Sequence, residues 1–239
     1  MLDILDTGSA PAQDNMDLDA KLLSCLTPDS SPLLHFYEWA GPSATFGHFI
    51  RPEKHFDLKK AEWHHLSLAK RPTGGGIIFH IWDFAFSFLM PASHPFFSLN
   101  TLENYQFVNE RVRDAMQELF PLQGKAEIIP EDFASQHEEA VNFCMAKPTQ
   151  YDVVYEGTKI AGAAQRKTKL GYLHQGSISL VFPQVELLKE VLLSKQTIVE
   201  AMTRYSFAPL GRQWDAARLK ETRKAIQDRL TQKFKERLL

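Results

Sequence analysis

The alternation of apolar and polar positions predicts a chain of short strands and helices. Between residues 101 and 120, apolar residues recur at spacings of three and four, which predicts one long helix that backs a sheet. A turn at Glu156-Gly157 is expected to join two strands as a hairpin. Short apolar runs bounded by turn residues predict strands at Leu33–Trp39, Leu66–Ala69, Ile77–Phe79, Phe84–Leu89, Gln150–Tyr155, Lys159–Ala164 and Ser177–Phe182. This pattern favours an α/β domain with a mixed, largely antiparallel sheet flanked by helices.

Shorter helices are expected around Leu18–Leu23 and over Phe56–His65, Glu186–Leu193 and Thr197–Tyr205. The last segment, residues 214–239, is charged throughout but places apolar residues on one face, which predicts an amphipathic helix that docks on its own domain. That face consists of Leu219, Ile226, Leu230, Phe234 and Leu238.

The length of 239 residues fits one domain, so we expect residues 1–239 to form a single catalytic-type domain without a separate accessory domain. The most polar stretch, Asp132–Val141, is expected to be a mobile loop.

Composition narrows the function classes. The formal charge is −2 without a long block of like charges, so nucleic acid is not an expected partner. No window approaches ~18 consecutive apolar residues, and Met1–Asp6 carries acidic residues where a signal peptide needs basic ones. Cys25 and Cys144 do not make a disulfide framework. We therefore expect a cytoplasmic protein with no membrane contact, and we expect Cys25 to be a core residue.

Three consecutive glycines, Gly74–Gly76, follow Arg71-Pro72-Thr73. They remove every Cβ at one point of the backbone, so another molecule can lie against the main chain. The apolar run Ile77–Phe79 follows directly, which places the glycines at the mouth of a sheet and not in a linker.

Two residues are candidates for chemistry. Lys159 begins a strand of small residues, Ile160–Ala164, where a single cation could stabilise an oxyanion or a phosphate. The alternative is an exposed hairpin lysine, whose replacement would change folding little. Cys144 lies among apolar residues, and on this pattern alone it is either a small core residue or a nucleophile.

Taken in order, three motifs resemble the catalytic domain of the lipoate-protein ligase and octanoyltransferase family, which is related to biotin protein ligase. They are Arg71–Gly76 with a strand ending in His80, then Lys159–Arg166, then His174–Ser177. Lys70 stands where the family pattern has a first arginine. The resemblance covers roughly residues 10 to 210 and implies the fold of the biotin/lipoate protein ligase catalytic domain.

In the branch of this family that carries a cysteine before the lysine strand, that cysteine is the nucleophile, and Cys144 holds this place 15 residues ahead of Lys159. The resemblance therefore implies that an octanoyl or lipoyl group passes through a Cys144 thioester to a lysine of a lipoyl-carrier protein, with Lys159 at the activated acyl group. A nearby cation must favour the thiolate. Lys159 and His80 are candidates, although His80 could instead only orient the glycine strand.

The resemblance also implies substrate-binding residues, and it implies no metal site. These residues are Arg71, Thr73, Gly74, Gly75, Gly76, His80, Gly162, Ala163, His174 and Gly176. We expect an apolar tunnel between Gly74–Gly76 and Lys159–Ala164. Burial of seven methylenes there, at about 0.8 kcal/mol each, would supply about 5–6 kcal/mol of binding.

A transferase would need no cofactor. Its implied acceptors are lipoyl domains of 2-oxoacid dehydrogenases or the glycine cleavage H protein, and acyl carrier protein is a possible donor. The alternative is an ATP-dependent lipoate ligase that uses ATP and Mg and forms an acyl-adenylate. Against the ligase stand Ile81–Phe84 after the histidine, and a chain that ends too soon for the usual accessory domain. Phe49-Ile50 replaces a pocket glutamine, which weakens both assignments. A non-catalytic binder of lipoyl domains is a further alternative, and biotin ligation is disfavoured because the biotin branch carries a different Gly-Arg-Gly motif.

Overall fold

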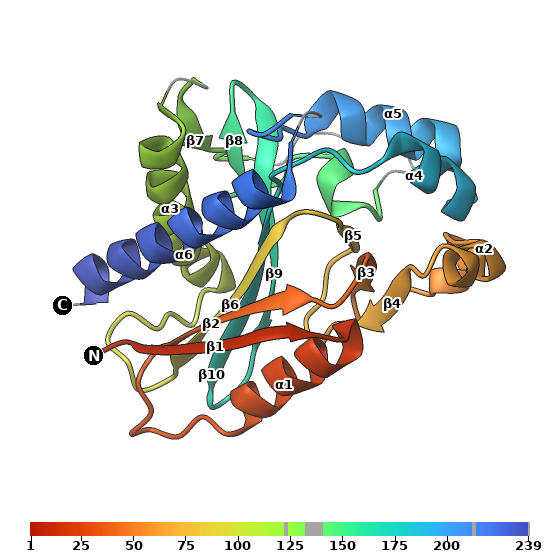
Figure 1. Cartoon of the computed structure of the whole chain (residues 1–239). Helices are drawn as coiled ribbons and strands as arrows, with labels where there is room; N and C mark the ends of the chain where they lie inside the picture. The colour runs from red at the N-terminus through yellow and green to blue at the C-terminus, as the bar shows by residue number, and fades with distance from the viewer. Residues whose placement is uncertain (122–123, 132–140, 212–213, 239) are drawn as a thin grey trace.

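The computed structural model describes residues 1–121, 124–131, 141–211 and 214–238. The loop expected over Asp132–Val141 falls outside these residues, apart from Val141 itself. Within the described part of the chain, the strands form a large sheet and a small one, with helices around them (Figure 1).

The large sheet contains seven strands in the order β1-β2-β6-β10-β9-β8-β7. Its neighbouring strands are antiparallel except β1 and β2, which run parallel. The expected mixed, largely antiparallel sheet is therefore confirmed. Its strands are β1 (Asp3–Ala10), β2 (Leu33–Trp39), β6 (Phe84–Pro91), β7 (Ala126–Ile128), β8 (Val153–Tyr155), β9 (Thr158–Lys167) and β10 (Gly171–Ile178).

The small sheet has the order β4-β3-β5, in which β3 runs parallel to β4 and antiparallel to β5. It holds the glycine run, because residues 74–76 connect β4 to β5. Its strands are β3 (Ser43–Phe46), β4 (Ser67–Lys70) and β5 (Ile77–His80).

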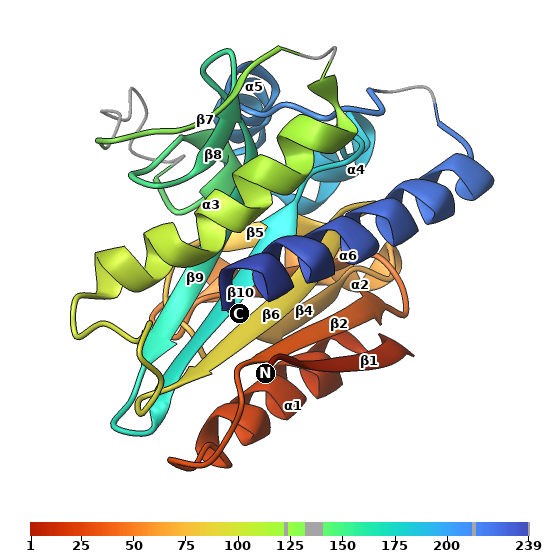
Figure 2. The same cartoon turned by 90° about the vertical axis from the view of Figure 1, so that its left-hand side faces the viewer.

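Helices cover both faces of the large sheet. Helices α3 and α6 lie side by side on one face, and α1 lies on the other (Figure 2). Phe88 of β6 stacks on Phe234 of α6 with ring centroids 4.5 Å apart, so the C-terminal helix closes the main core. The helices are α1 (Ala12–Ser24), α2 (Leu58–Trp63), α3 (Thr101–Leu119), α4 (Val185–Val191), α5 (Lys195–Tyr205) and α6 (Ala216–Leu238), with 3-10 turns η1 (Pro52–Lys54) and η4 (Cys144–Ala146).

The amphipathic pattern of the last segment describes α6 well. Leu219, Ile226, Leu230 and Phe234 are buried, and Leu238 packs against the same core. This burial is the source of the helix's stability, because a charged helix gains little from propensity alone.

The strand expected over Ser177–Phe182 is wrong in its extent. Strand β10 ends at Ile178 and begins as far back as Gly171, after a tight turn in which the Thr168 N–H donates to the Gly171 carbonyl. Residues beyond it leave the sheet, yet Val181 is only 2% exposed. The apolar run therefore reflects burial of a connecting segment, which periodicity cannot distinguish from a strand.

Two further features depart from expectation. The polar strand β1 shows no apolar alternation, because it is an edge strand with mostly exposed side chains that pairs with β2 through its backbone. Cys25 is exposed and not a core residue, because it caps the C-terminus of α1, two residues beyond buried Leu23.

Candidate functional site

A cavity lies between the small sheet and the β9–β10 hairpin. Cys144 and one buried cation, Arg71, line it. The remaining walls are mostly apolar or backbone, as expected of a site that holds an aliphatic group. They consist of Met16, Tyr37, Trp39, Thr45, Ile78, His80, Gly162, Ala163, Ala164, Gln175, Gly176 and Ser177.

Cys144 is positioned by its neighbours on both sides. The preceding Asn142 carbonyl accepts a 2.6 Å hydrogen bond from the Ile77 N–H, which ties the segment to β5. A Cβ at Gly76 would lie 2.3 Å from that same carbonyl, so only glycine permits this approach. Phe143 is 1% exposed and stacks on Phe79. Cys144 is therefore the first residue of the 3-10 turn η4, and its thiol is held at a fixed point on the cavity wall.

Arg71 is held rigidly by the small sheet and the glycine run. Its Nη1 donates to the carbonyl and the Oγ1 of Thr45, at 3.0 and 2.8 Å. Its Nη2 donates to the carbonyls of Gly74 and Gly76, at 3.1 and 2.7 Å. A guanidinium has five N–H donors, and the buried Nε is left without a partner among the described residues.

The Arg71 guanidinium interacts with the thiol of Cys144. Burial lowers the pKa of Arg71, whereas the nearby Cys144 group, as thiolate, opposes that shift. Arg71 is therefore a cation that lies beside the thiol of Cys144 in the cavity.

Lys159 is buried, contrary to the exposed hairpin reading. Its Nζ lies 2.6 Å from Asp152 Oδ2 and donates to the Cys144 carbonyl at 2.8 Å. The side chain crosses Gly162, where a Cβ would lie 2.5 Å from Lys159 Cε. Lys159 thus contacts the backbone of the nucleophile's turn, and Gly162 makes room for it.

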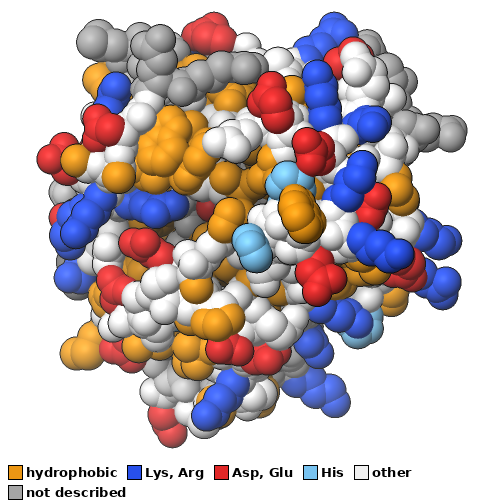
Figure 3. Space-filling model, turned by 45° about the vertical axis from the view of Figure 1, so that its right-hand side comes forward, with side chains coloured by type: hydrophobic (Ala, Val, Ile, Leu, Met, Phe, Trp, Pro, Cys, Tyr) orange, Lys and Arg blue, Asp and Glu red, His pale blue; other side chains and the backbone are white. Residues whose placement is uncertain are grey.

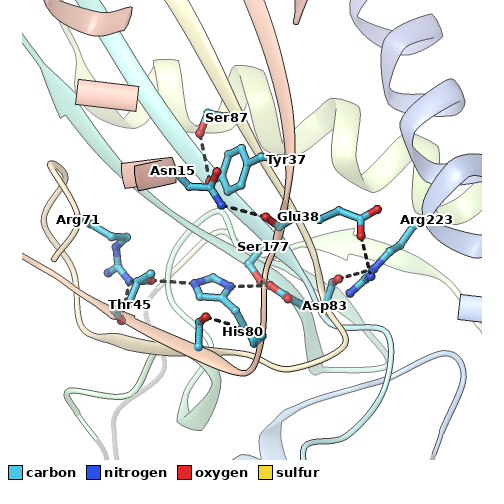
Figure 4. Close-up of polar contacts among 12 residues, drawn as sticks. Asn15, Tyr37, Glu38, Thr45, Arg71, His80, Asp83, Ser87, Ser177 and Arg223 are labelled. Carbon is cyan, nitrogen blue, oxygen red and sulfur yellow. Dashed lines mark hydrogen bonds and ion pairs between the residues drawn. The ribbon is translucent and has the colours of Figure 1, made fainter. Parts of the chain in front are cut away.

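His80 lies between Thr45 and Asp83. Its Nε2 is 2.8 Å from Thr45 Oγ1 and its Nδ1 is 2.7 Å from Asp83 Oδ2, which also accepts from Ser177 Oγ at 2.7 Å (Figure 4). The imidazole stacks on Trp39 with centroids 4.0 Å apart. The ring is therefore fixed in plane and in orientation, and it lines the cavity.

The structure brings some of the expected binding residues to the cavity and leaves others behind it. Thr73 Oγ1 donates to Gln175, which does line it. Gly75 has φ +84° and faces Ala164, since its Cβ would lie 3.4 Å from the alanine Cβ. Arg71, His80, Gly162, Ala163 and Gly176 line the cavity directly.

His174 lies behind the wall. It is fully buried against Phe86 and Tyr105, and burial lowers its pKa to about 3. Gln165 Nε2 lies 3.2 Å from its Nδ1. The imidazole is therefore neutral near pH 7 and does not line the cavity.

Several site residues carried no assigned role in the sequence. Asp152 precedes β8 and its Oδ2 is capped by the Thr149 N–H and hydroxyl, at 2.7 and 2.6 Å. Tyr105 belongs to the apolar stripe of α3, but its hydroxyl bonds both the N–H and the carbonyl of Ala163. The sequence feature that could have revealed the Lys159–Asp152 pair is their seven-residue spacing. The β8–β9 hairpin lies between them and brings their side chains together.

Acidic and basic side chains are interspersed around a patch of hydrophobic side chains on the face drawn in Figure 3. This face therefore presents no continuous field of one sign. Among the residues that the structure describes, no helix has both the length and the apolar character needed to cross a membrane.

Comparison with known proteins agrees with this geometry. Residues 11–235 match the Lipoyl protein ligase A/B catalytic domain, and the chain belongs to this family. It is 32% identical over 181 residues to octanoyltransferase LipM of Geobacillus kaustophilus and 30% identical over 176 residues to octanoyltransferase LipM of Staphylococcus aureus. These alignments cover 74% and 73% of this chain, and 64% of the length of each relative.

Solved structures share the fold. A lipoate protein ligase of T. acidophilum with bound lipoic acid superposes with a TM-score of 0.71 at 21% identity, covering 98% of this chain and 86% of the other. Lipoate-protein ligase A bound with ATP gives the same TM-score and identity, covering 98% and 84%. The biotin/lipoate protein ligase fold expected from the motifs is therefore confirmed.

Proposed function

We propose that this chain is an acyltransferase that moves an octanoyl or lipoyl group from a thioester donor to a lysine of a lipoyl-carrier protein, through a thioester on Cys144. The observation that carries the proposal is the thiol of Cys144 in a largely apolar cavity, beside a buried guanidinium whose Nε–H has no partner among the described residues. The similarity to octanoyltransferases supports the same chemistry.

In the first step the Cys144 thiolate attacks the donor carbonyl and forms a tetrahedral oxyanion. The bond to the carrier sulfur then breaks, and the carrier leaves as a thiolate that takes up a proton. Arg71 favours the attacking thiolate, and its free Nε–H is a donor for negative charge that develops in the site. Because four of its five donors are already bonded, this donor needs little reorganisation.

In the second step a neutral lysine amine of the acceptor attacks the Cys144 thioester. The carbon–sulfur bond breaks, an amide forms, and the proton lost by the nitrogen returns to the sulfur. Splitting one transfer into two steps is the usual benefit of covalent catalysis. Neither step requires ATP, Mg or another cofactor.

Lys159 supports this chemistry from behind the nucleophile. Its ammonium binds the Cys144 carbonyl, so it fixes the turn that presents the thiol, and its charge lies close to the reacting group. Asp152 holds the ammonium in place at 2.6 Å.

The cavity walls select the acyl chain by size and apolarity, not by polar contacts along its length. The acceptors that fit are lipoyl domains of 2-oxoacid dehydrogenases or the H protein of glycine cleavage, and acyl carrier protein fits as the donor. We place the reaction in the cytoplasm, where a reduced thiol persists.

Intact mass spectrometry tests the proposal. The protein is incubated with octanoyl-acyl carrier protein, or with octanoate, ATP and Mg, and Cys144→Ala serves as the control. We expect one octanoyl adduct with the thioester donor, removed by hydroxylamine and missing in the control. Acceptor modification only with octanoate and ATP would establish a ligase. No modification under either condition, with binding to lipoyl domains retained, would establish a binder.

A further inference from the structure

We infer that Thr45, His80 and Asp83 form a hydrogen-bonded chain that orients Arg71 toward Cys144 and thereby sets the reactivity of the thiol. The inference rests on the proposed function, because it assigns positioning residues to the same site. Figure 4 shows the members of the chain joined in sequence by dashed contacts.

The direction of the chain follows from its two ends. Arginine only donates, so Thr45 Oγ1 accepts from Arg71 Nη1 at 2.8 Å. We assign the one hydroxyl hydrogen of Thr45 to its other partner, so that His80 Nε2 accepts it. His80 Nδ1 therefore carries the ring hydrogen and donates to Asp83 Oδ2 at 2.7 Å. The charge of Asp83 thus polarises each donor in turn, up to the guanidinium.

The Asp83 end of the hydrogen-bonded chain is fixed by contacts from other parts of the fold. Ser177 Oγ of β10 donates to Asp83 Oδ2, and Arg223 Nε of α6 donates to the Asp83 carbonyl at 2.9 Å. Trp82, with φ +64°, packs on Trp214 with centroids 4.5 Å apart. A strained residue persists only where its surroundings hold it, so the turn before β6 is held in one conformation.

Titratable and charged side chains from several elements surround this hydrogen-bonded chain. Tyr37 and Glu38 approach from β2, Arg223 from α6, and the thiol of Cys144 from η4. All four members of the chain, from Asp83 to Arg71, are at most 6% exposed. Water therefore competes little with these bonds, and loss of the Thr45 hydroxyl removes one of the four bonds that set the position of the guanidinium.

The test is the pH profile of Cys144 alkylation by iodoacetamide, measured in a Cys25→Ser background because Cys25 is exposed. This readout requires no acyl donor or acceptor. Thr45→Val removes the hydroxyl and keeps the shape. It should lower the alkylation rate at pH 7 by roughly three- to tenfold, the size expected for one lost hydrogen bond, and shift the profile to higher pH.

Thr45→Ser restores the hydroxyl and should rescue most of the rate. Asp83→Asn keeps the shape without the charge and should shift the profile in the same direction as Thr45→Val. The matched control is Thr168→Val, because Thr168 donates its hydroxyl to the Gly171 carbonyl in the β9–β10 turn, outside the chain.

A profile of Thr45→Val equal to that of the background, in a protein with an unchanged thermal melt, would overturn the inference. An equal shift in Thr168→Val would also overturn it, since general loosening would then be the cause. Wild-type protein that alkylates normally but never forms an octanoyl adduct would refute the proposed function. It would not refute the inferred role of the hydrogen-bonded chain.

Discussion

The Nζ of Lys159 lies 2.6 Å from Oδ2 of Asp152, and the two side chains are 3% and 0% exposed. This ion pair is placed to contribute both to the stability of the fold and to the proposed catalysis. Asp152 is satisfied by the Thr149 N–H and hydroxyl, and Lys159 also binds the carbonyl of the nucleophile. We therefore expect stability and the proposed catalysis to depend on this one buried contact.

Lys159→Ala should destabilise the fold and slow the reaction. An unpaired buried carboxylate remains, so the free energy of unfolding should fall by about 3–5 kcal/mol. The transfer rate should fall by about 10²–10³ at a temperature where the variant is folded. Urea denaturation and single-turnover transfer measure the two effects separately.

Two controls define that prediction. Lys125→Ala removes an exposed lysine that pairs with Glu127, and should leave stability close to that of the wild type. Lys159→Met combined with Asp152→Asn removes both charges, and should recover most of the stability but not the rate. If Lys159→Ala kept the stability and the transfer rate of the wild type, Lys159 would have neither role.

Arg71→Lys should not be conservative. A lysine offers one point charge and cannot bind the Thr45 and glycine carbonyls while presenting a further donor to the thiol. We expect the alkylation rate of Cys144 at pH 7 to fall roughly tenfold or more, because the sulfur loses the guanidinium that interacts with it. An unchanged alkylation profile would mean that another group sets the state of the thiol.

Ala164→Leu should shorten the acyl chains that the enzyme accepts. Ala164 lines the cavity and packs against Gly75, so three added carbons take space from an aliphatic group bound there. The ratio of kcat/KM for octanoyl to butanoyl donors should fall at least tenfold, because each excluded methylene forfeits about 0.8 kcal/mol. Equal loss for long and short chains in a normally melting variant would place the acyl chain elsewhere.

His174 should make stability depend on pH. Burial lowers the pKa of His174 to about 3, whereas an unfolded histidine titrates near 6.5. Between these values the unfolded chain binds more protons, so stability falls as the pH falls and this contribution is unchanged above about pH 6.5. The loss should approach about 1.4 kcal/mol per pH unit between pH 6 and 4.

His174→Asn keeps an acceptor near Gln165 and removes the titration. Urea denaturation at pH 7, 6 and 5 should show a flatter dependence in this variant than in the wild type. An identical dependence in both would show that His174 is protonated without cost.

The fold was largely predictable because its core elements carry clear periodicity. The β2 pattern and the α3 stripe gave correct segments, and the motif order gave the correct fold family. Edge strand β1 was not predictable, because its pairing uses backbone groups that every sequence possesses. The extent of β10 was misjudged, because burial of Val181 in a connecting segment resembles burial in a strand.

The site was predictable at the level of motifs but not of partners. Cys144 and Arg71 were named, yet their proximity depends on a return of the chain that brings Asn142 to Ile77. Burial of Lys159 was not predictable, because it depends on the missing Cβ at Gly162 and on the carboxylate of Asp152, which lies just before β8. Such contacts are set by tertiary packing, which local patterns do not encode.

The most direct test of the account isolates the acyl-enzyme and follows its fate. Protein loaded with octanoyl on Cys144 is freed of donor, mixed with a lipoyl domain, quenched at intervals and weighed by intact mass spectrometry. We predict that the octanoyl mass leaves the enzyme and appears on the acceptor lysine at a rate at least equal to the steady-state turnover, without ATP. An octanoyl group that stays on Cys144, or an acceptor modified at full rate by Cys144→Ala, would contradict the account.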